Sequence, residues 1–289
     1  MIERELRIRI GTDTAQVAER ALAEDGPDDV TTRAAVAPDQ FGTAIIEFRS
    51  AGVLAGTAYA DAVTTLCELG GVIWQSATGS SIPAGTTVGS LQGNLTRILR
   101  AERPMLNLLQ RAVGIATATR AYVERVAGTP TRILHTRKTA PGLRLLDVSA
   151  VLAGGGQLHR VDLGDTLMIK DNHWRSMERS GRGLGEVLAQ ARAHGIAQCQ
   201  VEVESVEQVE LACAAGADRL LVDNQTPETV RKWATLARGR RPGIEIEATG
   251  GITLENVRNF AEAGADFVSI GALTHSVVAA DIALEVELD

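Results

Sequence analysis

The chain has 289 residues, of which 45% are hydrophobic and 22% are charged, and this balance excludes a disordered or collagen-like protein. Its formal charge of −7 argues against a nucleic-acid-binding surface, and the lack of any run of about 18 apolar residues argues against a transmembrane helix. Three widely spaced cysteines form no CxxC pair, so neither a disulfide framework nor a zinc site is predicted. Residues 1–7 lack the apolar middle of a secretory signal, and we expect a cytoplasmic protein.

The first hundred residues mix helical and strand patterns, which is typical of an α+β layer domain. We expect helices at 12–22 and 58–69, and short strands at 43–48, 52–54, 71–74 and 87–91. Asp13 and Gln16 predict a capping box at the start of the first helix. A long helical region follows at 96–126. Within it Pro104 predicts a helix start or a kink, because proline has no backbone N–H to donate.

From residue 132 onward, short aliphatic strands alternate with helical patterns, which predicts parallel βα units around a buried sheet. The expected strands lie at 132–134, 166–169, 199–203, 219–222, 244–248 and 267–270. The expected helices lie at 183–194, 206–215, 227–237 and 254–263. The tetrapeptide AGAD ends two of these helices, with glycine as the terminating residue. The repeat favours a β/α barrel with ligands at the carboxyl ends of its strands, and an open doubly wound sheet is the alternative.

The middle of this acidic chain carries an excess of positive charge. Residues 132–175 contain seven arginines and lysines against four acidic residues. Arg137 and Lys138 follow the strand at 132–134 and precede a Pro-Gly turn. Arginine suits bidentate contacts with carboxylates or phosphates and lysine acts as a point charge, so the turn predicts a pocket for a small anion. A solvated basic face would show the same pattern.

Two further polar segments stand after glycines or a strand. Three glycines at 154–156 permit a close approach of the backbone to a ligand, and they lead to His159 and Arg160. The strand at 166–169 ends in Lys170, whose ammonium group is a candidate partner for a substrate carboxylate. A flexible glycine loop and an ordinary surface loop are the alternatives for these two segments.

Two acids stand in or at the ends of consecutive apolar strands, Glu202 and Asp223. A carboxylate in such a place needs compensation, because burying a bare charge is costly. Magnesium commonly takes one or two carboxylates and shares substrate phosphates, and sugar hydroxyls would also compensate the charge. The alternative is an internal salt bridge with Lys138 or Lys170.

The turn after the strand at 244–248 consists of Thr249, Gly250 and Gly251. Glycines between a strand and a helix expose backbone amides at the helix N-terminus, which bind anions. The following strand ends at Gly271, and the loops after the last two strands of β/α barrels frequently bind phosphate. We therefore predict a phosphate at this turn. For His275, further along the chain, two interpretations stay open: a neighbour of this phosphate or, as is more common for a lone histidine, a structural hydrogen-bonding group.

Several blocks of residues, in order along the chain, resemble the quinolinate phosphoribosyltransferase (carboxylating nicotinate-nucleotide pyrophosphorylase) family. The longest block, which begins at His135, is HTRKTAPGLRLLDVSAVLAGGGQLHRVDLGDTLMIKDNHW. Shorter blocks are ALAEDGPDDVTT, AERPMLNLLQRAVGIATATRAYV, VEVES, LLVDN, EATGGITLENVR and VSIGALTHS. The resemblance covers roughly residues 20 to 285.

The resemblance implies an α/β fold, namely an incomplete β/α barrel with an N-terminal α/β sandwich domain, assembled as a homodimer. We expect the sandwich at 1–112, completed by 275–289, and the barrel at 113–274. The implied activity is a phosphoribosyl transfer that depends on Mg²⁺ and belongs to NAD biosynthesis. It converts quinolinate and phosphoribosyl pyrophosphate to nicotinate mononucleotide, pyrophosphate and carbon dioxide.

The same resemblance assigns roles to individual residues. Arg103 is expected to reach the active site of the neighbouring subunit. The residues expected to bind the acceptor are Arg103, Arg137, Lys138, His159, Arg160 and Lys170. The expected catalytic residues are Lys138, Lys170, Glu202 and Asp223, of which the two acids would engage magnesium and the ribose hydroxyls. The residues expected to hold the 5-phosphate are Thr249, Gly250, Gly251 and Gly271.

The chain departs from the family pattern near the ring carboxylates of the expected acceptor. His135 stands where the family usually has aspartate, and the other departures are Val148, Leu152 and Leu158. Two alternatives to the quinolinate enzyme follow. One is a paralogous phosphoribosyltransferase that acts on a different pyridine or related carboxylate. The other is a non-catalytic regulator that binds a phosphate ligand, although such a protein would not need the whole charged set.

Overall fold

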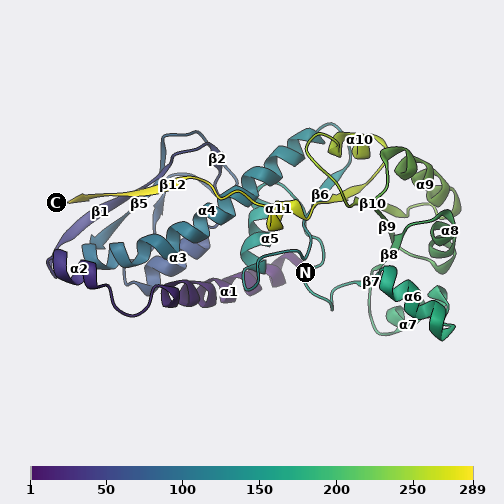
Figure 1. Ribbon diagram of the computed structural model, residues 1–289, viewed down its shortest axis with the longest axis horizontal. Helices are drawn as coiled ribbons and strands as arrows, with labels where there is room; N and C mark the ends of the chain where they lie inside the picture. Colours follow the sequence, from purple (N-terminus) through teal and green to yellow (C-terminus); the bar gives the residue numbers. More distant parts are fainter. Residues whose placement is uncertain (1, 289) are drawn as a thin grey trace. The chain divides into compact units, whose positions relative to one another are not determined.

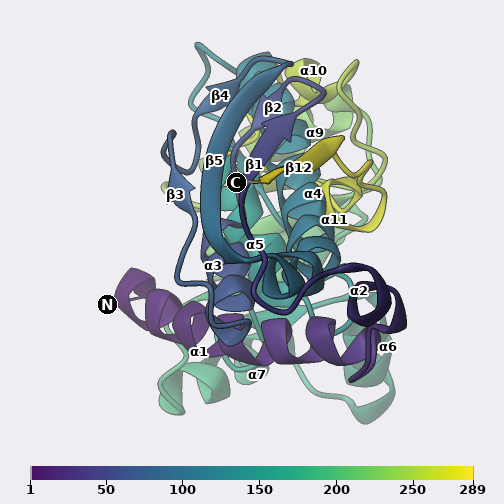
Figure 2. The same cartoon turned by 90° about the vertical axis from the view of Figure 1, so that its left-hand side faces the viewer.

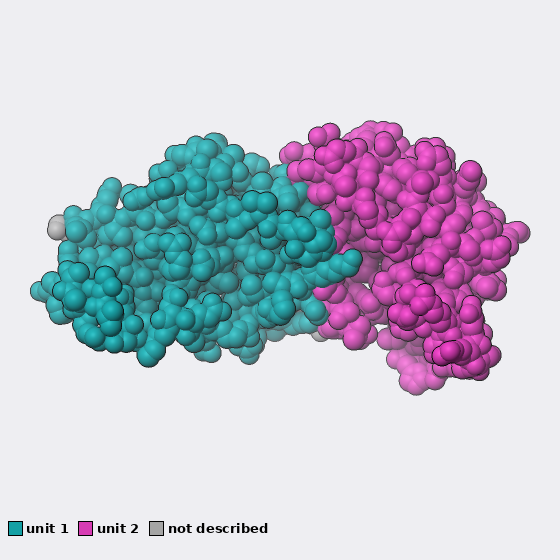
Figure 3. Space-filling model, in the orientation of Figure 1, with its two compact units in different colours: residues 1–120, 138–155, 272–289 teal, residues 121–137, 156–271 magenta. Residues whose placement is uncertain are grey.

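The computed structural model describes residues 2–288 (Figure 1). The chain forms two compact units (Figure 3). The first unit comprises residues 1–120, 138–155 and 272–289, and the second comprises residues 121–137 and 156–271. The expected domain boundaries at 112 and 274 stay a prediction, and Met1 and Asp289, which fall within the expected sandwich, lie outside the described residues.

The first unit is built on a four-stranded antiparallel sheet with the order β12-β1-β5-β3. Its strands are β1 (Phe41–Phe48), β3 (Ile73–Trp74), β5 (Thr86–Asn94) and β12 (Ile282–Leu288). Figure 2 shows β5, β1 and β12 side by side. Alternate residues of β1 are buried, including Ala44, Ile46 and Phe48, as expected for a sheet with one face on a core. A separate two-stranded sheet pairs β2 (Gly52–Val53) with β4 (Ser81–Ile82).

The helices of the first unit are α1 (Ile2–Glu24), α2 (Val30–Ala35), α3 (Thr57–Leu66), α4 (Leu95–Arg125, whose residues from 121 onward belong to the second unit), α5 (Arg144–Ala153) and α11 (Ala272–His275). The capping box expected at Asp13 is wrong, because α1 begins eleven residues earlier and Asp13 lies inside it. Instead, the Asp13 carboxylate accepts a hydrogen bond of 2.8 Å from the Tyr59 hydroxyl on α3. Burial and this hydrogen bond both raise the pKa of Tyr59, so the phenol stays a donor.

Pro104 does not start a helix, since α4 begins at Leu95 and continues past the proline to Arg125. A proline inside a helix costs about 3 kcal/mol or more, so another contribution has to offset it. The residues that follow supply that contribution, because Met105, Leu106 and Leu109 are almost completely buried in the core of the unit.

The second unit contains a six-stranded parallel sheet with the order β6-β11-β10-β9-β8-β7. Its strands are β6 (Arg132–Leu134), β7 (Leu167–Ile169), β8 (Cys199–Val203), β9 (Arg219–Asp223), β10 (Glu245–Thr249) and β11 (Phe267–Ser269). The strands follow one another in chain order, with β6 paired to β11 and an opening between β6 and β7. In a doubly wound sheet the order of the strands reverses at a switch point, and this sheet shows no such reversal. The open doubly wound sheet is therefore wrong, and the incomplete barrel is confirmed.

The helices of the second unit are α6 (Asp171–Ser180), α7 (Leu184–Ala193), α8 (Val206–Ala215), α9 (Pro227–Arg240) and α10 (Val257–Glu262). In Figure 1, α8, α9 and α10 lie along one side of the strands that they connect. All five residues of β8 are buried, which is typical of parallel strands covered on both faces. Within residues 2–288 no helix combines the length and apolar character needed to cross a membrane.

A buried ion pair in the first unit generates a stability prediction. Asp147 on α5 is fully buried and accepts two hydrogen bonds of 2.7 Å from the Arg111 guanidinium on α4. It also accepts one from the backbone of Ala140. We expect Asp147→Ala to lower the free energy of unfolding by about 3–5 kcal/mol, because it leaves Arg111 without its counterion. Chemical denaturation measures this, and an effect no larger than that of Glu285→Ala at an exposed pair would contradict it.

Candidate functional site

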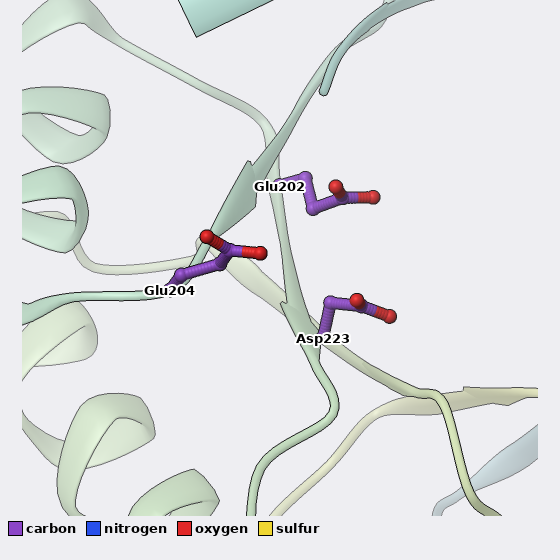
Figure 4. Close-up of side chains that lie close together, drawn as sticks. All are labelled: Glu202, Glu204 and Asp223. Carbon is purple, nitrogen blue, oxygen red and sulfur yellow. The ribbon is translucent and has the colours of Figure 1, made fainter. Parts of the chain in front are cut away.

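Three carboxylates gather at the carboxyl-terminal end of β8 and β9 (Figure 4). Glu202 and Glu204 are two residues apart on one chain segment, so their side chains leave the same face of the sheet. Asp223 ends the neighbouring strand. One oxygen from each of the three lies within 4.8 Å of the others. Oxygen ligands in this number suit a hard divalent cation such as Mg²⁺.

Glu204 was not among the residues expected from the sequence. The signal was present, because Glu204 repeats Glu202 at the strand period of two and therefore had to share its face. The two acids differ in exposure: Glu202 is buried and Glu204 is exposed. Glu204 is thus the more accessible of the two to a ligand.

Glu202 already has a cationic partner inside the unit. The Lys170 ammonium group donates a hydrogen bond of 2.6 Å to the Glu202 carboxylate. Lys170 also stands at the N-cap of α6, and the ring N–H of Trp174 on that helix donates to the backbone carbonyl of Glu202. The internal salt bridge considered as an alternative is therefore formed with Lys170. Because the Lys170 side chain is still 43% exposed, the pair remains open to a ligand on one side.

The guanidinium groups of Arg137 and Arg160 interact electrostatically. Burial and the charge of Arg137 both lower the pKa of Arg160, although the guanidinium stays protonated. The Nε atom of Arg137 is buried and has no hydrogen-bond partner within residues 2–288. Two like charges in a partly buried place, one with a donor unused, favour the binding of an anion. This arrangement matches the expected role of both residues toward a carboxylate.

His159 lies in a network of buried polar groups. Its Nε2 is 3.3 Å from the Glu247 carboxylate, and its Nδ1 accepts a hydrogen bond of 2.7 Å from the backbone N–H of Arg160. Arg219 donates to the same Glu247 carboxylate at 2.9 Å and to Glu245 at 2.8 Å. Both ring nitrogens of His159 thus have protein partners. The sequence pattern did not indicate that Glu247 and Arg219 belong to this network.

The turn after β10 has a backbone that only glycine adopts readily. Gly250 and Gly251 have φ values of 82° and 61°, in the left-handed region. A Cβ atom on Gly250 would lie 2.2 Å from the side-chain oxygen of Asn224, so no other residue fits there. The helix that follows begins at Val257, three residues later than expected, after a turn in which the Asn256 side chain accepts from Thr253 N–H.

The remaining residues expected at the site divide between the two units. In the second unit, Gly271 follows β11 by two residues. In the first unit, Arg103 lies on α4 with a 58% exposed side chain, 3.4 Å from Glu102. Lys138 also belongs to the first unit, where its backbone carbonyl accepts a hydrogen bond of 2.8 Å from the Thr274 hydroxyl. His275 on α11 contacts the Ser276 hydroxyl.

Glu247 generates a prediction for the dependence of stability on pH. Burial alone would raise its pKa, but the hydrogen bond from His159 and the charge of Arg219 lower it from 4.5 to about 2. A carboxyl whose pKa is lowered by folding stabilises the protein above its ordinary pKa and loses this contribution as the pH falls toward the folded value. We therefore expect wild type to exceed Glu247→Gln in free energy of unfolding above about pH 5, by a margin that shrinks toward pH 2. Denaturant titrations across this range test it, and a constant margin would contradict it.

Comparison with known proteins identifies the family. The quinolinate phosphoribosyl transferase N-terminal domain matches residues 29–113, and the C-terminal domain of the same family matches residues 115–285. Curated relatives are the nicotinate-nucleotide pyrophosphorylase [carboxylating] of Mycobacterium leprae, 39% identical over 92% of this chain and 94% of the relative, and the probable enzyme of that name from Bacillus subtilis, 38% identical over 92% and 91%. A solved nicotinate-nucleotide pyrophosphorylase from Francisella tularensis superimposes with a TM-score of 0.88, at 32% identity over 96% of this chain and 97% of that one. The chain therefore belongs to the quinolinate phosphoribosyltransferase family.

Proposed function

We propose that the protein is a phosphoribosyltransferase of NAD biosynthesis. It converts quinolinate and phosphoribosyl pyrophosphate to nicotinate mononucleotide, pyrophosphate and carbon dioxide. The observation that carries the proposal is the presence, in one parallel-stranded unit, of two interacting arginines and a three-carboxylate cluster. A dicarboxylate acceptor needs the first, and a ribose bearing a pyrophosphate needs the second. The names of the relatives from Mycobacterium leprae and Bacillus subtilis support the same activity.

The acceptor half of the site is cationic. Arg137 and Arg160 suit the two ring carboxylates, because a guanidinium matches a carboxylate in a bidentate fork. A bound carboxylate would also relieve the repulsion between the two arginines. Lys170 adds charge at the reacting centre and is held in place by its ion pair with Glu202. Positioning of this kind lets the pyridine nitrogen face the ribose carbon that it attacks.

The donor half of the site is acidic. Glu202, Glu204 and Asp223 offer oxygen atoms close enough together to hold Mg²⁺, or to accept hydrogen bonds from the ribose hydroxyls. When bound, Mg²⁺ supplies positive charge to the departing pyrophosphate. The turn at Thr249, Gly250 and Gly251, with Gly271, is the proposed place of the 5-phosphate, because its glycines allow close approach of the backbone.

The order of bond changes follows from these charges. The bond between ribose C1 and pyrophosphate breaks, and the pyridine nitrogen donates its electron pair to C1, so the ring nitrogen becomes cationic. The cationic ring then accepts the electron pair of the adjacent carbon–carboxylate bond, which releases carbon dioxide, and the ring carbon takes up a proton. The side chains contribute mainly orientation and electrostatic stabilisation.

The first test is direct. Purified protein is incubated with quinolinate, phosphoribosyl pyrophosphate and Mg²⁺, and the formation of nicotinate mononucleotide and carbon dioxide is followed. We expect both products in equal amounts, and none when magnesium is removed by chelation. A folded protein that binds phosphoribosyl pyrophosphate but forms no product would reject quinolinate as the acceptor.

The carboxylate cluster makes a second prediction. Glu204→Gln and Asp223→Asn should each raise the magnesium concentration for half-maximal rate by at least about 10-fold, because each removes a charged oxygen ligand. Their free energies of unfolding should change little, since Glu204 is exposed and Asp223 is partly exposed. Exposed Glu262→Gln in the same unit is the matched control. Loss of folding in step with loss of activity in both variants would favour a structural role for the cluster.

Assembly as a homodimer is part of the proposal, with Arg103 acting in the partner's active site. The exposure of Arg103 on α4 supports this, because 58% of its side chain is accessible and it lies beside its chain neighbour Glu102. If Arg103 acts across the interface, Arg103→Ala and Asp223→Asn complement each other at a magnesium concentration too low for Asp223→Asn to be active alone. A mixture of Arg103→Ala and Asp223→Asn should recover about one quarter of wild-type activity after subunit exchange, since half of the dimers carry one intact site. No recovery, with exchange verified by mass spectrometry, would place Arg103 in the site of its own chain.

A second candidate function is a phosphoribosyltransferase with a different pyridine or related carboxylate as acceptor. The observation that favours it is His135, a fully buried imidazole that contacts the backbone of His159, where the resemblance leads us to expect aspartate. Activity with another pyridine acid, together with no activity on quinolinate, distinguishes this candidate.

A cytoplasmic location completes the proposal, and fractionation of the source cells tests it.

A further inference from the structure

His135 occupies an unusual place at the end of β6. The segment that carries His159 runs parallel to β6, and the backbone N–H of Gln157 donates a hydrogen bond of 2.7 Å to the carbonyl of Ile133. In a regular parallel ladder the next donor on this segment, the N–H of His159, would bond to the backbone carbonyl of residue 135. Instead it donates to the ring Nε2 of His135 at 3.0 Å. The imidazole therefore replaces one backbone acceptor of the ladder.

The donors around the two rings define their protonation. An amide N–H can only donate, so Nε2 of His135 is unprotonated, and its Nδ1 carries the proton 3.2 Å from the carbonyl oxygen of Thr136. Nδ1 of His159 is unprotonated for the same reason, because the N–H of Arg160 donates to it at 2.7 Å. Nε2 of His159 then carries the proton and faces Glu247 at 3.3 Å. Both rings are neutral in this arrangement, with opposite tautomers.

These contacts form a continuous chain that ends at the anion site. Arg219 holds Glu247, Glu247 holds the His159 ring, and that ring holds the backbone of Arg160. His135 fixes the backbone of His159 from the other side. His135 and Glu247 are at most 1% exposed, so water does not replace either contact. The segment begins after three consecutive glycines, which cannot hold Arg160 in one place by themselves.

We propose that His135 is a positioning residue, which through its Nε2 acceptor and the neutral His159 ring fixes Arg160 for binding of the acceptor carboxylate. The inference rests on the proposed function for the identity of the acceptor. His135 does not touch the substrate in this proposal. It acts on the acceptor side of the site, so binding of phosphoribosyl pyrophosphate should not depend on it.

The first experiment measures the tautomers in the wild-type protein. Long-range ¹H–¹⁵N spectra of the imidazole rings distinguish the two neutral tautomers and the imidazolium form, and single substitutions assign the five histidines. We expect a proton on Nδ1 of His135 and on Nε2 of His159 at neutral pH. The opposite tautomer in either ring, or an imidazolium in either ring, overturns the proposal. This readout requires no activity, so it decides the inference even if quinolinate proves not to be the acceptor.

The second experiment compares three variants by steady-state kinetics with quinolinate, phosphoribosyl pyrophosphate and Mg²⁺. His135→Leu removes the acceptor at similar volume and should raise KM for quinolinate at least ~10-fold, because it orphans a buried N–H. KM for phosphoribosyl pyrophosphate should stay within about twofold, a change too small to reflect lost binding energy. His135→Gln, whose side-chain oxygen reaches the Nε2 position, should recover most of the lost affinity. His194→Gln, at an exposed histidine of the same unit, is the matched control.

The outcomes separate the proposed role of His135 from the proposed activity on quinolinate. No turnover of quinolinate by wild type rejects the proposed acceptor alone, and the ring spectra then decide the role of His135. Equal rises in KM for both substrates, or equal losses in His135→Leu and His135→Gln, reduce His135 to a structural residue and overturn the inference. If His135→Leu does not fold, hydrogen exchange of the His159 backbone amide tests the proposal instead. This exchange should be slow in wild type and in His135→Gln, because the amide donates a hydrogen bond to the side chain at position 135. Rapid exchange in wild type overturns it.

Discussion

A charge placed among parallel strands has to be neutralised there, and this constraint organises the second unit. The Arg219 side chain on β9 is only 8% exposed, and its guanidinium meets Glu245 and Glu247 on β10 and the ring of Phe267 on β11. Because an unpaired buried ion costs several kcal/mol, these partners fix the register of three strands more sharply than apolar contacts alone. Glu247 has a second partner in His159, so the same constraint extends from the sheet to the segment that carries His159 and Arg160.

Acidic side chains that follow one another along the same face of the sheet differ in burial and in their partners. Glu202 on β8 is buried and pairs with Lys170, whereas Glu204, directly after the end of the strand, is exposed. Two residues along a strand correspond to about 6.6 Å along the backbone, but the carboxylates of the two acids converge to within 4.8 Å, so Glu202 links the internal ion pair to the cluster. Asp223 joins the cluster from the next strand. The site is therefore the uppermost layer of a charged interior, and its precision derives from the layer beneath it.

Much of this could be read from the sequence, because aliphatic runs bounded by polar residues and glycines mark parallel strands clearly. The strand at 199–203 and the helix at 206–215 were predicted to the residue, and the family was identified from its motifs. Other features depend on distances that a linear pattern does not contain. Polar residues after Lys170 suggested a loop but start α6, and Lys170 could not be assigned to Glu202 rather than to a ligand. Arg219 passed unnoticed because a lone arginine at the start of a strand is ordinarily a surface residue.

The first unit has a discontinuous chain, and this affects how the protein is made. Strand β12 pairs with β1 over seven residues, although the two are separated by more than 230 positions in the chain. During synthesis β1 therefore presents an unpaired edge until residues 282–288 have left the ribosome, while every strand of the second unit is already available. An open edge is a template for wrong pairing between nascent chains. The exposed charges of β12, including Glu285 and Glu287, reduce that risk only once the strand has docked.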